Sequence, residues 1–359
     1  MSDATAQHDE ADEPADRGFE AAAVDEEDGT GWAAFPFGLY SPETHLALGA
    51  FGVAFFRMPG EAEDTRTSSV ALLGLGTTRS QAIVELIPEF YFDSERWHLW
   101  TKFDFRLFPD SYFGIGPTAP EAAEERYDAI SYRYRMLLRR QLVSALRIGF
   151  WADAQHFTIT ETIDNGVFDR EDVQGEDGGF TLGLGARVDW DTRDNPIDAR
   201  SGAYYQGSFT SWLAPFSDHT FSRLTFDLRQ YVTLTGTHSL AFQLYADLSF
   251  GRPPFYLMPG IGGPYLMRGY FEGRYRDAGA VLGQVEYRFP IFWRFRGVAF
   301  VSAGEVAPRI DQVDLSNPKV AGGGGLRFVI NEDQRLAVRA DLGVTPEGWG
   351  LYLNISEAF

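Results

Sequence analysis

The chain has 359 residues, no cysteine, and a formal net charge of −20 from 31 basic and 51 acidic residues. Without cysteine, it has no internal disulfides, thiolate metal sites or cysteine nucleophiles. The acidic balance argues against a nucleic-acid-binding protein, which needs a basic surface to displace counterions. Aromatic residues make up 15% of the chain, too many for a disordered polymer.

Residues 1–32 are expected to form a disordered acidic tail. Residues 1–31 contain eleven acidic residues and one basic residue, Arg17, which together account for about half of the net charge. The tail has almost no large apolar residue that could offset the entropy lost on ordering. A solvated tail is the simplest interpretation, and a docking segment for a basic partner is the alternative. The first residues also lack the basic and apolar regions of a secretory signal, so no signal peptide is expected in this chain.

Period-two alternation dominates the chain after the tail. Between residues 335 and 344, one face carries Leu336, Val338 and Leu342. The opposite face of this segment carries Arg339 and Asp341. Such alternation is typical of strands with one apolar and one polar face. The strands expected from it lie at 43–58, 66–77, 80–92, 97–108, 128–139, 142–156, 179–191, 202–212, 219–232, 238–249, 280–292, 296–304, 320–330, 335–344 and 349–358.

These segments predict an all-β fold, a transmembrane antiparallel β-barrel over residues 33–359. Many are ten residues or longer, the length of a tilted membrane-spanning strand, and aromatic residues gather at their ends. A soluble β-sandwich is the competing architecture, with the apolar faces turned inward. Because single-chain bacterial barrels have an even number of strands, we expect about 16, with the missing strand inside 157–178 or hidden where two strands are read as one. A false split, which would give about 14 strands, is the less favoured alternative. The longest apolar stretch, Leu46 to Phe56, has 11 residues, too few for a membrane helix.

The polar faces mix both charge signs, which favours a hydrated barrel interior held by ion pairs over a catalytic centre. No His-Glu-x-x-His or Gly-x-Ser-x-Gly motif occurs in the sequence. We therefore predict no metal, no cofactor and no catalytic residue, although a serine–histidine pair formed only in space would leave no local motif. An outer-membrane enzyme remains a less favoured alternative.

Several motifs lie in a characteristic order on this alternating chain. The long connection between segments 238–249 and 280–292 contains Arg268-Gly269-Tyr270. An Asp-Thr-Arg-Asp-Asn-Pro sequence occupies 191–196, and Gly-Leu-Arg-Phe at 325–328 precedes Arg-Ala-Asp-Leu-Gly at 339–343. Together, residues 40–359 resemble the barrel of the BamA/TamA outer-membrane assembly superfamily, also called the bacterial surface antigen family.

The resemblance implies that a long extracellular loop, residues 250–279, folds into the barrel lumen. Arg268, Gly269 and Tyr270 would form its tip, with Met267 in place of the usual valine. In the family, a later strand usually presents Phe-x-Asp-x-Gly, whose aspartate pairs with the loop arginine. Here Ser302 occupies the aspartate position.

Another acidic residue is therefore expected to pair with Arg268, because a guanidinium inside the barrel needs charge-assisted partners. Glu286 and Asp341 are the candidates, with Ser302 as a third possible lumen partner. The alternative is that Arg268 faces water. Substitutions of Arg268, Glu286 and Asp341 would distinguish these cases through their effect on stability.

The chain ends on Phe359 after an alternating segment, which resembles the terminal-strand signature of bacterial outer-membrane barrels. Trp349, Leu351 and Leu353 alternate toward it. Glu357 departs from the signature, because an apolar residue is usual at that position.

The resemblance implies location in the bacterial outer membrane and a role in membrane-protein assembly or protein translocation. Family members that insert or translocate proteins carry POTRA domains before the barrel, whereas this chain offers only the acidic tail. We therefore expect contact with outer-membrane lipid, client membrane proteins of unknown identity, and a separate periplasmic POTRA-bearing or chaperone protein. A weak seam between the first and last strands would accept client strands; crosslinking at Ala50 and Leu353 would test it. The main alternative is a passive pore plugged by the 250–279 loop.

Overall fold

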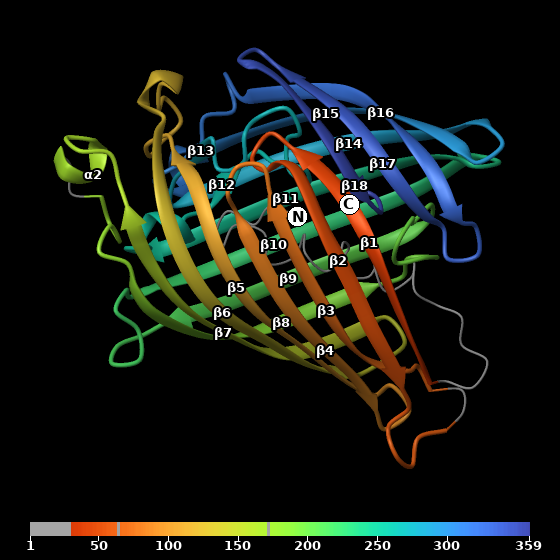
Figure 1. Ribbon diagram of the computed structural model, residues 1–359. Helices are drawn as coiled ribbons and strands as arrows, with labels where there is room; N and C mark the ends of the chain where they lie inside the picture. Colours follow the sequence, from red (N-terminus) through yellow and green to blue (C-terminus); the bar gives the residue numbers. More distant parts are fainter. Residues whose placement is uncertain (1–29, 63–64, 171–172) are drawn as a thin grey trace.

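A computed structural model gives the fold as a closed barrel of sixteen antiparallel strands (Figure 1). It describes residues 30–62, 65–170 and 173–359, so residues 1–29 of the expected tail lie outside the described residues. The barrel strands are β1 (Gly31–Ser41), β2 (His45–Phe56), β3 (Ser68–Thr77), β4 (Ala82–Phe92), β5 (Trp97–Tyr112), β6 (Glu125–Gln141), β7 (Leu146–Glu161), β8 (Gly179–Asp191), β9 (Gly202–Trp212), β10 (Phe221–Thr235), β11 (His238–Gly251), β14 (Gly279–Phe292), β15 (Phe295–Ala307), β16 (Lys319–Asn331), β17 (Leu336–Thr345) and β18 (Gly348–Ile355).

The remaining elements are short. Strands β12 (Gly260–Ile261) and β13 (Tyr275–Arg276) form a separate two-stranded pair inside the long connection between β11 and β14. One α-helix, α2 (Val167–Arg170), and three single 3₁₀ turns complete the described structure; the turns span Glu121–Ala123, Phe255–Leu257 and Ile310–Gln312. Among the described residues, no helix has the length and apolar character to cross a membrane.

Most barrel strands separate an exposed apolar face from a buried polar face, whereas β1, β2 and β3 carry apolar side chains on the buried face as well. On β17, Leu342 is 45% exposed and Val344 is 51% exposed, whereas Asp341 is fully buried. Because successive side chains of a strand point to opposite sides, the alternation in the sequence becomes an apolar outer surface and a polar inner face. This arrangement is that of a membrane barrel and excludes the soluble sandwich, in which the apolar faces would be turned inward.

The connections between strands lie at two opposite mouths, because consecutive barrel strands are antiparallel. We call one the loop mouth, since it carries the long connection 252–278 together with 42–44, 113–124 and 346–347. We call the other the terminal mouth, since β1 starts and β18 ends there, beside connections 93–96, 192–201 and 332–335.

The strand missing from the sequence prediction is β1, Gly31–Ser41, and not a segment of 157–178. Residues 157–178 contain the end of β7 and helix α2. Strand β1 escapes detection because its inner face carries Phe35, Phe37 and Leu39 instead of polar residues, so no apolar–polar alternation is visible. With β1 included, the first barrel strand begins at Gly31, two residues before the predicted start of the barrel at residue 33.

The β1–β18 seam differs from every other junction in the barrel wall. One registered pair, Tyr40 with Leu353, joins these strands in the described residues. On its other side, β1 pairs with β2 along its whole length, from Gly31↔Phe55 to Ser41↔His45. Ala50 lies on β2 opposite Pro36, so it is Tyr40 and not Ala50 that borders Leu353 across the seam.

Candidate functional site: a buried loop beside the strand seam

The connection 252–278, here called the inner loop, is packed away from solvent. From Pro253 to Asp277 every residue is buried except Gly269 and Phe271, which are half-buried. Its contacts are to polar side chains on the inner face of β14, β17 and β18, as the next paragraphs show. The loop therefore packs against the inner face of the wall.

The Arg268 guanidinium lies between two buried carboxylates from different strands. Its Nη1 is 2.5 Å from Asp341 Oδ2 on β17, and its Nη2 is 2.6 Å from Glu286 Oε2 on β14. All three side chains have 0% exposure. Charge-assisted hydrogen bonds are shorter and stronger than those between neutral groups. The structure thus brings together Arg268 and both of the acidic residues proposed from the sequence.

Ser302 does not contact Arg268. Its hydroxyl donates a hydrogen bond to the Ala321 carbonyl oxygen, 3.4 Å away. The ring of Phe300, from the same Phe-x-Ser-x-Gly segment, instead lies under the guanidinium, with the Arg268 Cζ 3.6 Å from the ring centroid. A cation over an aromatic face is attracted by the ring quadrupole. Sequence reasoning missed Phe300, although it lies in a motif that was singled out.

The backbone of the loop tip rests directly on a glycine of β17. A Cβ built at Gly343 would lie 2.3 Å from the Arg268 carbonyl oxygen and 2.6 Å from the Gly269 nitrogen. Gly269 itself has φ +117°, a conformation that favours glycine. Glycine at both positions allows the two backbones to approach this closely.

The inner loop also joins the elements on both sides of the seam. Tyr352 on β18 accepts a hydrogen bond from the Gly269 N–H at 3.0 Å and donates one to the Tyr270 carbonyl at 3.1 Å. The Glu272 N–H donates to Glu43, in the β1–β2 turn, at 2.9 Å. Arg274 forms an ion pair with Glu347, in the β17–β18 turn, at 2.8 Å. The tip Arg268-Gly269-Tyr270 therefore lies beside the seam.

Residues 356–359 depart from the predicted terminal strand. Strand β18 ends at Ile355, and Ser356 has a positive φ of 68°. Phe359 is 5% exposed and belongs to a buried cluster with Tyr231 of β10 and Ala241 of β11. The terminal aromatic residue is therefore buried in the barrel interior and does not extend the outer surface of β18.

The turn 192–201 at the terminal mouth is fixed by the motif recognised in the sequence. Asp194 accepts hydrogen bonds from the N–H groups of Arg200 at 2.9 Å and Ser201 at 3.1 Å, and it pairs with Arg335 at 2.6 Å. Partial burial opposes ionisation, but these hydrogen bonds hold the pKa of Asp194 below its usual value. A Cβ at Gly202, which has φ +94°, would lie 2.0 Å from the Thr192 carbonyl oxygen, so this turn requires glycine.

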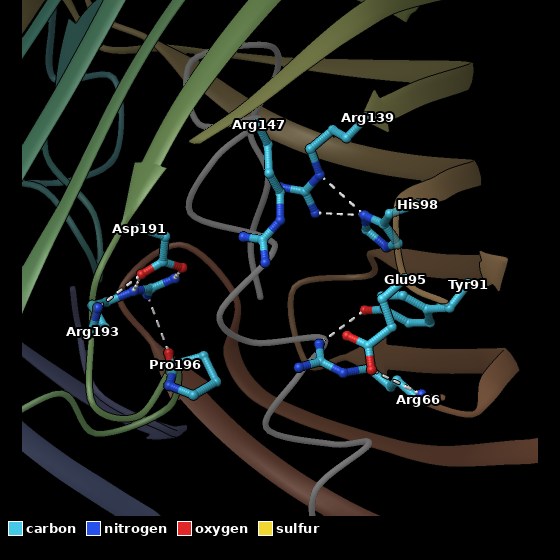
Figure 2. A pocket seen from close by; sticks show the side chains of 9 residues that line it. All are labelled: Arg66, Tyr91, Glu95, His98, Arg139, Arg147, Asp191, Arg193 and Pro196. Atoms are coloured by element: carbon cyan, nitrogen blue, oxygen red, sulfur yellow. Dashed lines mark hydrogen bonds and ion pairs between the residues drawn. The ribbon is translucent and has the colours of Figure 1, made fainter. Parts of the chain in front are cut away.

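A polar cavity of about 200 Å³ also opens at the terminal mouth (Figure 2). His98 Nδ1 lies 2.8 Å from Arg139 Nη2, and its Nε2 lies 2.5 Å from Glu89. Because guanidinium only donates, Nδ1 accepts and the ring proton is on Nε2, where it donates to Glu89. The cavity is lined by Arg66, Tyr91, Glu95, His98, Arg139, Arg147, Asp191, Arg193 and Pro196.

These contacts make the cavity wall a network of paired charges. Arg193 binds both oxygens of Asp191, at 3.0 and 2.9 Å. In the part of the chain that the structure describes, no group of three or more His, Asp or Glu residues is arranged to hold a metal ion. We take the inner loop as the candidate functional site because it contacts elements on both sides of the seam.

Comparison with known proteins agrees with this geometry. Residues 75–331 match the model of the Omp85 superfamily domain. The chain belongs to the Omp85 superfamily. A search of curated proteins finds no significant match.

Solved structures resemble this Omp85 barrel in fold. BamA from Haemophilus ducreyi lacking POTRA domains 1–3 matches with TM-score 0.62 and 13% identity, over 92% of this chain and 71% of that chain. CdiB from Escherichia coli matches with TM-score 0.61 and 11% identity, over 93% and 63%. CdiB from Acinetobacter baumannii matches with TM-score 0.57 and 12% identity, over 92% and 60%. The chain thus spans less than two thirds of the length of either CdiB chain, and the likeness establishes the barrel.

Proposed function

We propose that this Omp85 barrel assembles or translocates membrane proteins by accepting client strands at the β1–β18 seam. The observation that carries the proposal is the single registered pair across the seam, Tyr40 with Leu353. A barrel junction with one registered pair is held by a much shorter ladder than the other junctions of the wall. A strand at such a junction can act as a template for another strand.

The strand that would receive a client is β1. It pairs with β2 from Gly31 to Ser41, and its register with β18 is the single pair Tyr40↔Leu353. Pro36 lies in the middle of this edge. Proline lacks an amide hydrogen and is tolerated in strands mainly where a ladder partner is absent. Its position agrees with a short ladder between β1 and β18.

The inner loop distinguishes this proposal from a passive pore plugged by residues 250–279. A loop that is held to β14 and β17 by buried ion pairs, and to Tyr352 and Glu43 on the two flanks of the seam by hydrogen bonds, is expected to block steady conduction. Planar-bilayer conductance of the intact protein and of a variant lacking residues 255–276 separates the two functions. We expect low conductance from the intact barrel and high conductance after deletion, whereas a large, constant conductance of the intact protein would favour the pore.

The proposal includes an outer-membrane location and lipid around the apolar outer surface. It also includes a separate periplasmic POTRA-bearing or chaperone protein that delivers clients. From Thr30 onward the described residues form the barrel and its connections. Purification from outer membranes after chemical crosslinking, followed by mass spectrometry, would identify such a partner at the terminal mouth.

Photocrosslinking tests strand capture directly. A photoreactive residue at Ala34, on β1 beside the seam, is compared with one at Val84, on β4, which is paired on both sides. The probe is a urea-unfolded eight-stranded outer-membrane barrel protein added to proteoliposomes. We expect adducts from position 34 only, formed while the probe folds. Equal adducts from both positions would show that the seam is not the entry point.

A further inference from the structure

The lining of the terminal-mouth cavity carries more positive than negative charge. Among the residues that the structure describes, the lining contains four arginines and two carboxylates. Arg193 is matched by Asp191 on the same wall. Arg139 lies 3.5 Å from Asp189, but Asp189 also binds Arg187, at 2.7 Å. The acidic residues of the wall therefore do not balance its guanidinium groups.

Two arginines reach the cavity from different parts of the wall. Arg66 lies in the connection before β3, and Arg147 is the second residue of β7. Both side chains extend into the cavity (Figure 2). The Arg66 Nη1 donates to the Tyr91 hydroxyl at 3.1 Å, and its guanidinium lies 5.0 Å from the centre of that ring. These two contacts orient the guanidinium without cancelling its charge, because a tyrosine hydroxyl and ring are neutral.

The donor set of the cavity suits carboxylates. A guanidinium is planar and presents its N–H groups as a fork that matches the two oxygens of a carboxylate. Arg193 shows this geometry with Asp191, at 3.0 and 2.9 Å. A cleft lined mainly by one sign of charge also concentrates the opposite charge inside it. At about 200 Å³, the cavity has room for side chains of a short acidic peptide and not for a folded domain.

The chain itself contains such a peptide, Asp25-Glu26-Glu27-Asp28, here called the acidic run. It comes shortly before Gly31, where β1 starts at the terminal mouth. Neighbouring strands are about 4.8 Å apart, so β3, the second strand from β1, lies about 10 Å away. The three to six residues between the run and Gly31 span up to about 10–20 Å when extended. The acidic run is therefore long enough to reach Arg66.

We propose that the terminal-mouth cavity is a binding site for acidic peptide and that its occupant is the acidic run of the same chain. The carboxylates of the run bind Arg66 and Arg147 and supply the negative charge that the lining lacks. Docking tethers the acidic tail at the terminal mouth. The basic partner that the tail would need, one of the two interpretations of its sequence, is then the barrel itself. The inference does not depend on strand capture at the seam.

Spin labelling measures docking in the full chain, which contains no cysteine. A nitroxide on Val24→Cys reports next to the acidic run, and one on Ala4→Cys reports at the far end of the tail. Spectra recorded in phosphatidylcholine proteoliposomes give the ratio of immobilised to mobile label, which is the docking equilibrium constant. In a parallel preparation, a photoreactive residue at position 24 identifies by mass spectrometry which barrel residues it reaches.

Two variants of the tail, each lacking four carboxylates, test the occupant. The near variant is Asp25→Asn, Glu26→Gln, Glu27→Gln and Asp28→Asn. The far variant, its matched control, is Asp9→Asn, Glu10→Gln, Asp12→Asn and Glu13→Gln. We expect the label at position 24 to be largely immobilised in the parent, with adducts on residues that line the cavity. The near variant should lower the ratio by about tenfold or more, and the far variant should leave it unchanged.

A change in the wall tests the site. Arg147→Gln should lower the ratio in the same direction as the near variant. Arg309→Gln is its control, because Arg309 is 70% exposed and pairs with Asp311 beyond β15, at the loop mouth. Heat-modifiable gel migration verifies that the wall variants are folded. The near variant leaves the barrel sequence intact, so its result does not depend on a perturbed wall.

Equal ratios in the near and far variants would overturn the inference, and so would equal ratios in folded Arg147→Gln and Arg309→Gln. If another anion, such as a lipid phosphate, is the occupant, the label at position 24 will be as mobile as the label at position 4. Its photoadducts will then be absent from the cavity. That result also overturns the inference, and it leaves the proposed function untouched because no client is present in the experiment.

Discussion

The β5–β6 junction and the β1–β18 seam are built from the same kind of strand but are held together differently. Strands β5 and β6 pair without interruption from Trp97↔Arg140 to Tyr112↔Glu125. The seam has the single pair Tyr40↔Leu353. One backbone hydrogen bond makes a net contribution of about 0.5–1.5 kcal/mol to stability. The long β5–β6 ladder therefore stabilises its junction far more than the single registered pair stabilises the seam. The seam is therefore the junction of the closed wall with the shortest registered ladder.

The inner loop supplies contacts beside the seam, where the ladder is short, through the Arg268 side chain and through the backbone of Gly269 and Glu272. Asp341 and Tyr352 flank the seam on one side and Glu43 on the other, and all three contact the loop. The β5–β6 junction needs no such support from the loop tip. This difference predicts that changes at the loop tip weaken the seam and leave the ladder junctions intact.

The largest effect on stability is expected from Arg268→Ala. Removing the guanidinium leaves Glu286 and Asp341 close together and buried, and loss of one partner from a buried pair typically costs about 3–5 kcal/mol. Unfolding in detergent, followed by heat-modifiable gel migration, measures the change, with smaller losses expected for Glu286→Gln and Asp341→Asn. The control is Arg309→Ala, whose ion pair with Asp311 is exposed. If none of the three network variants is less stable than the control, the loop is not held by this network.

A steric change at the same contact should have a smaller effect. Gly343→Ala places a methyl group against the backbone of Arg268 and Gly269, and overpacking of this kind costs about 1–3 kcal/mol. Gly74→Ala on β3 is the matched control, because its new Cβ would meet nothing within 4 Å. Protease sensitivity of the inner loop should rise for Gly343→Ala alone. Equal sensitivity of the two variants would argue against close backbone contact at the tip.

The Glu43 contact at the seam should depend on pH. Burial raises the pKa of Glu43 above its ordinary value, and its Oε2 has no hydrogen-bond partner. A raised folded-state pKa means that the stability contributed by the protonated carboxyl is present at low pH and is lost as pH rises through that pKa. Glu43→Gln should therefore be more stable than the parent at pH 7 and equally stable below about pH 4. A constant difference across this range would contradict the prediction.

The smallest effect on stability is expected at Asp194 in the terminal mouth. Its pH dependence has the opposite direction to that of Glu43. The pKa of Asp194 is lowered, so its contribution is present above the unfolded-state pKa of about 3.9 and is lost as pH falls through the lower folded-state value. Asp194→Asn should be slightly less stable than the parent at pH 7. The difference should disappear in strong acid, which detergent unfolding at a series of pH values would show. A difference that grows on acidification would contradict this assignment.

The sequence predicts most of this fold because polar and apolar residues alternate wherever a strand has a polar inner face and an apolar outer face. Strand β17, with Asp341 inward and Leu342 outward, is a clear example. Strand β1 was missed because Phe35 and Phe37 make its inner face apolar as well. The alternation in the sequence depends on the two faces of a strand differing in polarity, so a strand with two apolar faces does not show it.

The site was predictable to the extent that charge must be balanced inside a barrel. Arg268 requires acids, and the sequence offers Glu286 and Asp341 on strands that can reach it. Phe300 was not predicted, because nothing in a sequence shows which ring lies under a guanidinium. The inward course of Phe359 was missed because the alternation that ends in it is equally compatible with a longer β18.

A reversible lock across the seam tests the central claim most directly. Cysteines at Tyr40 and Leu353, the registered pair, are oxidised in proteoliposomes, and insertion of a urea-unfolded eight-stranded barrel protein is then followed. Cysteines at Leu99 and Leu138, a registered pair of the β5–β6 junction, provide the matched control. We predict that the seam lock abolishes insertion, that reduction restores it, and that the control lock has no effect. Insertion at the parental rate through a locked seam would contradict the claim.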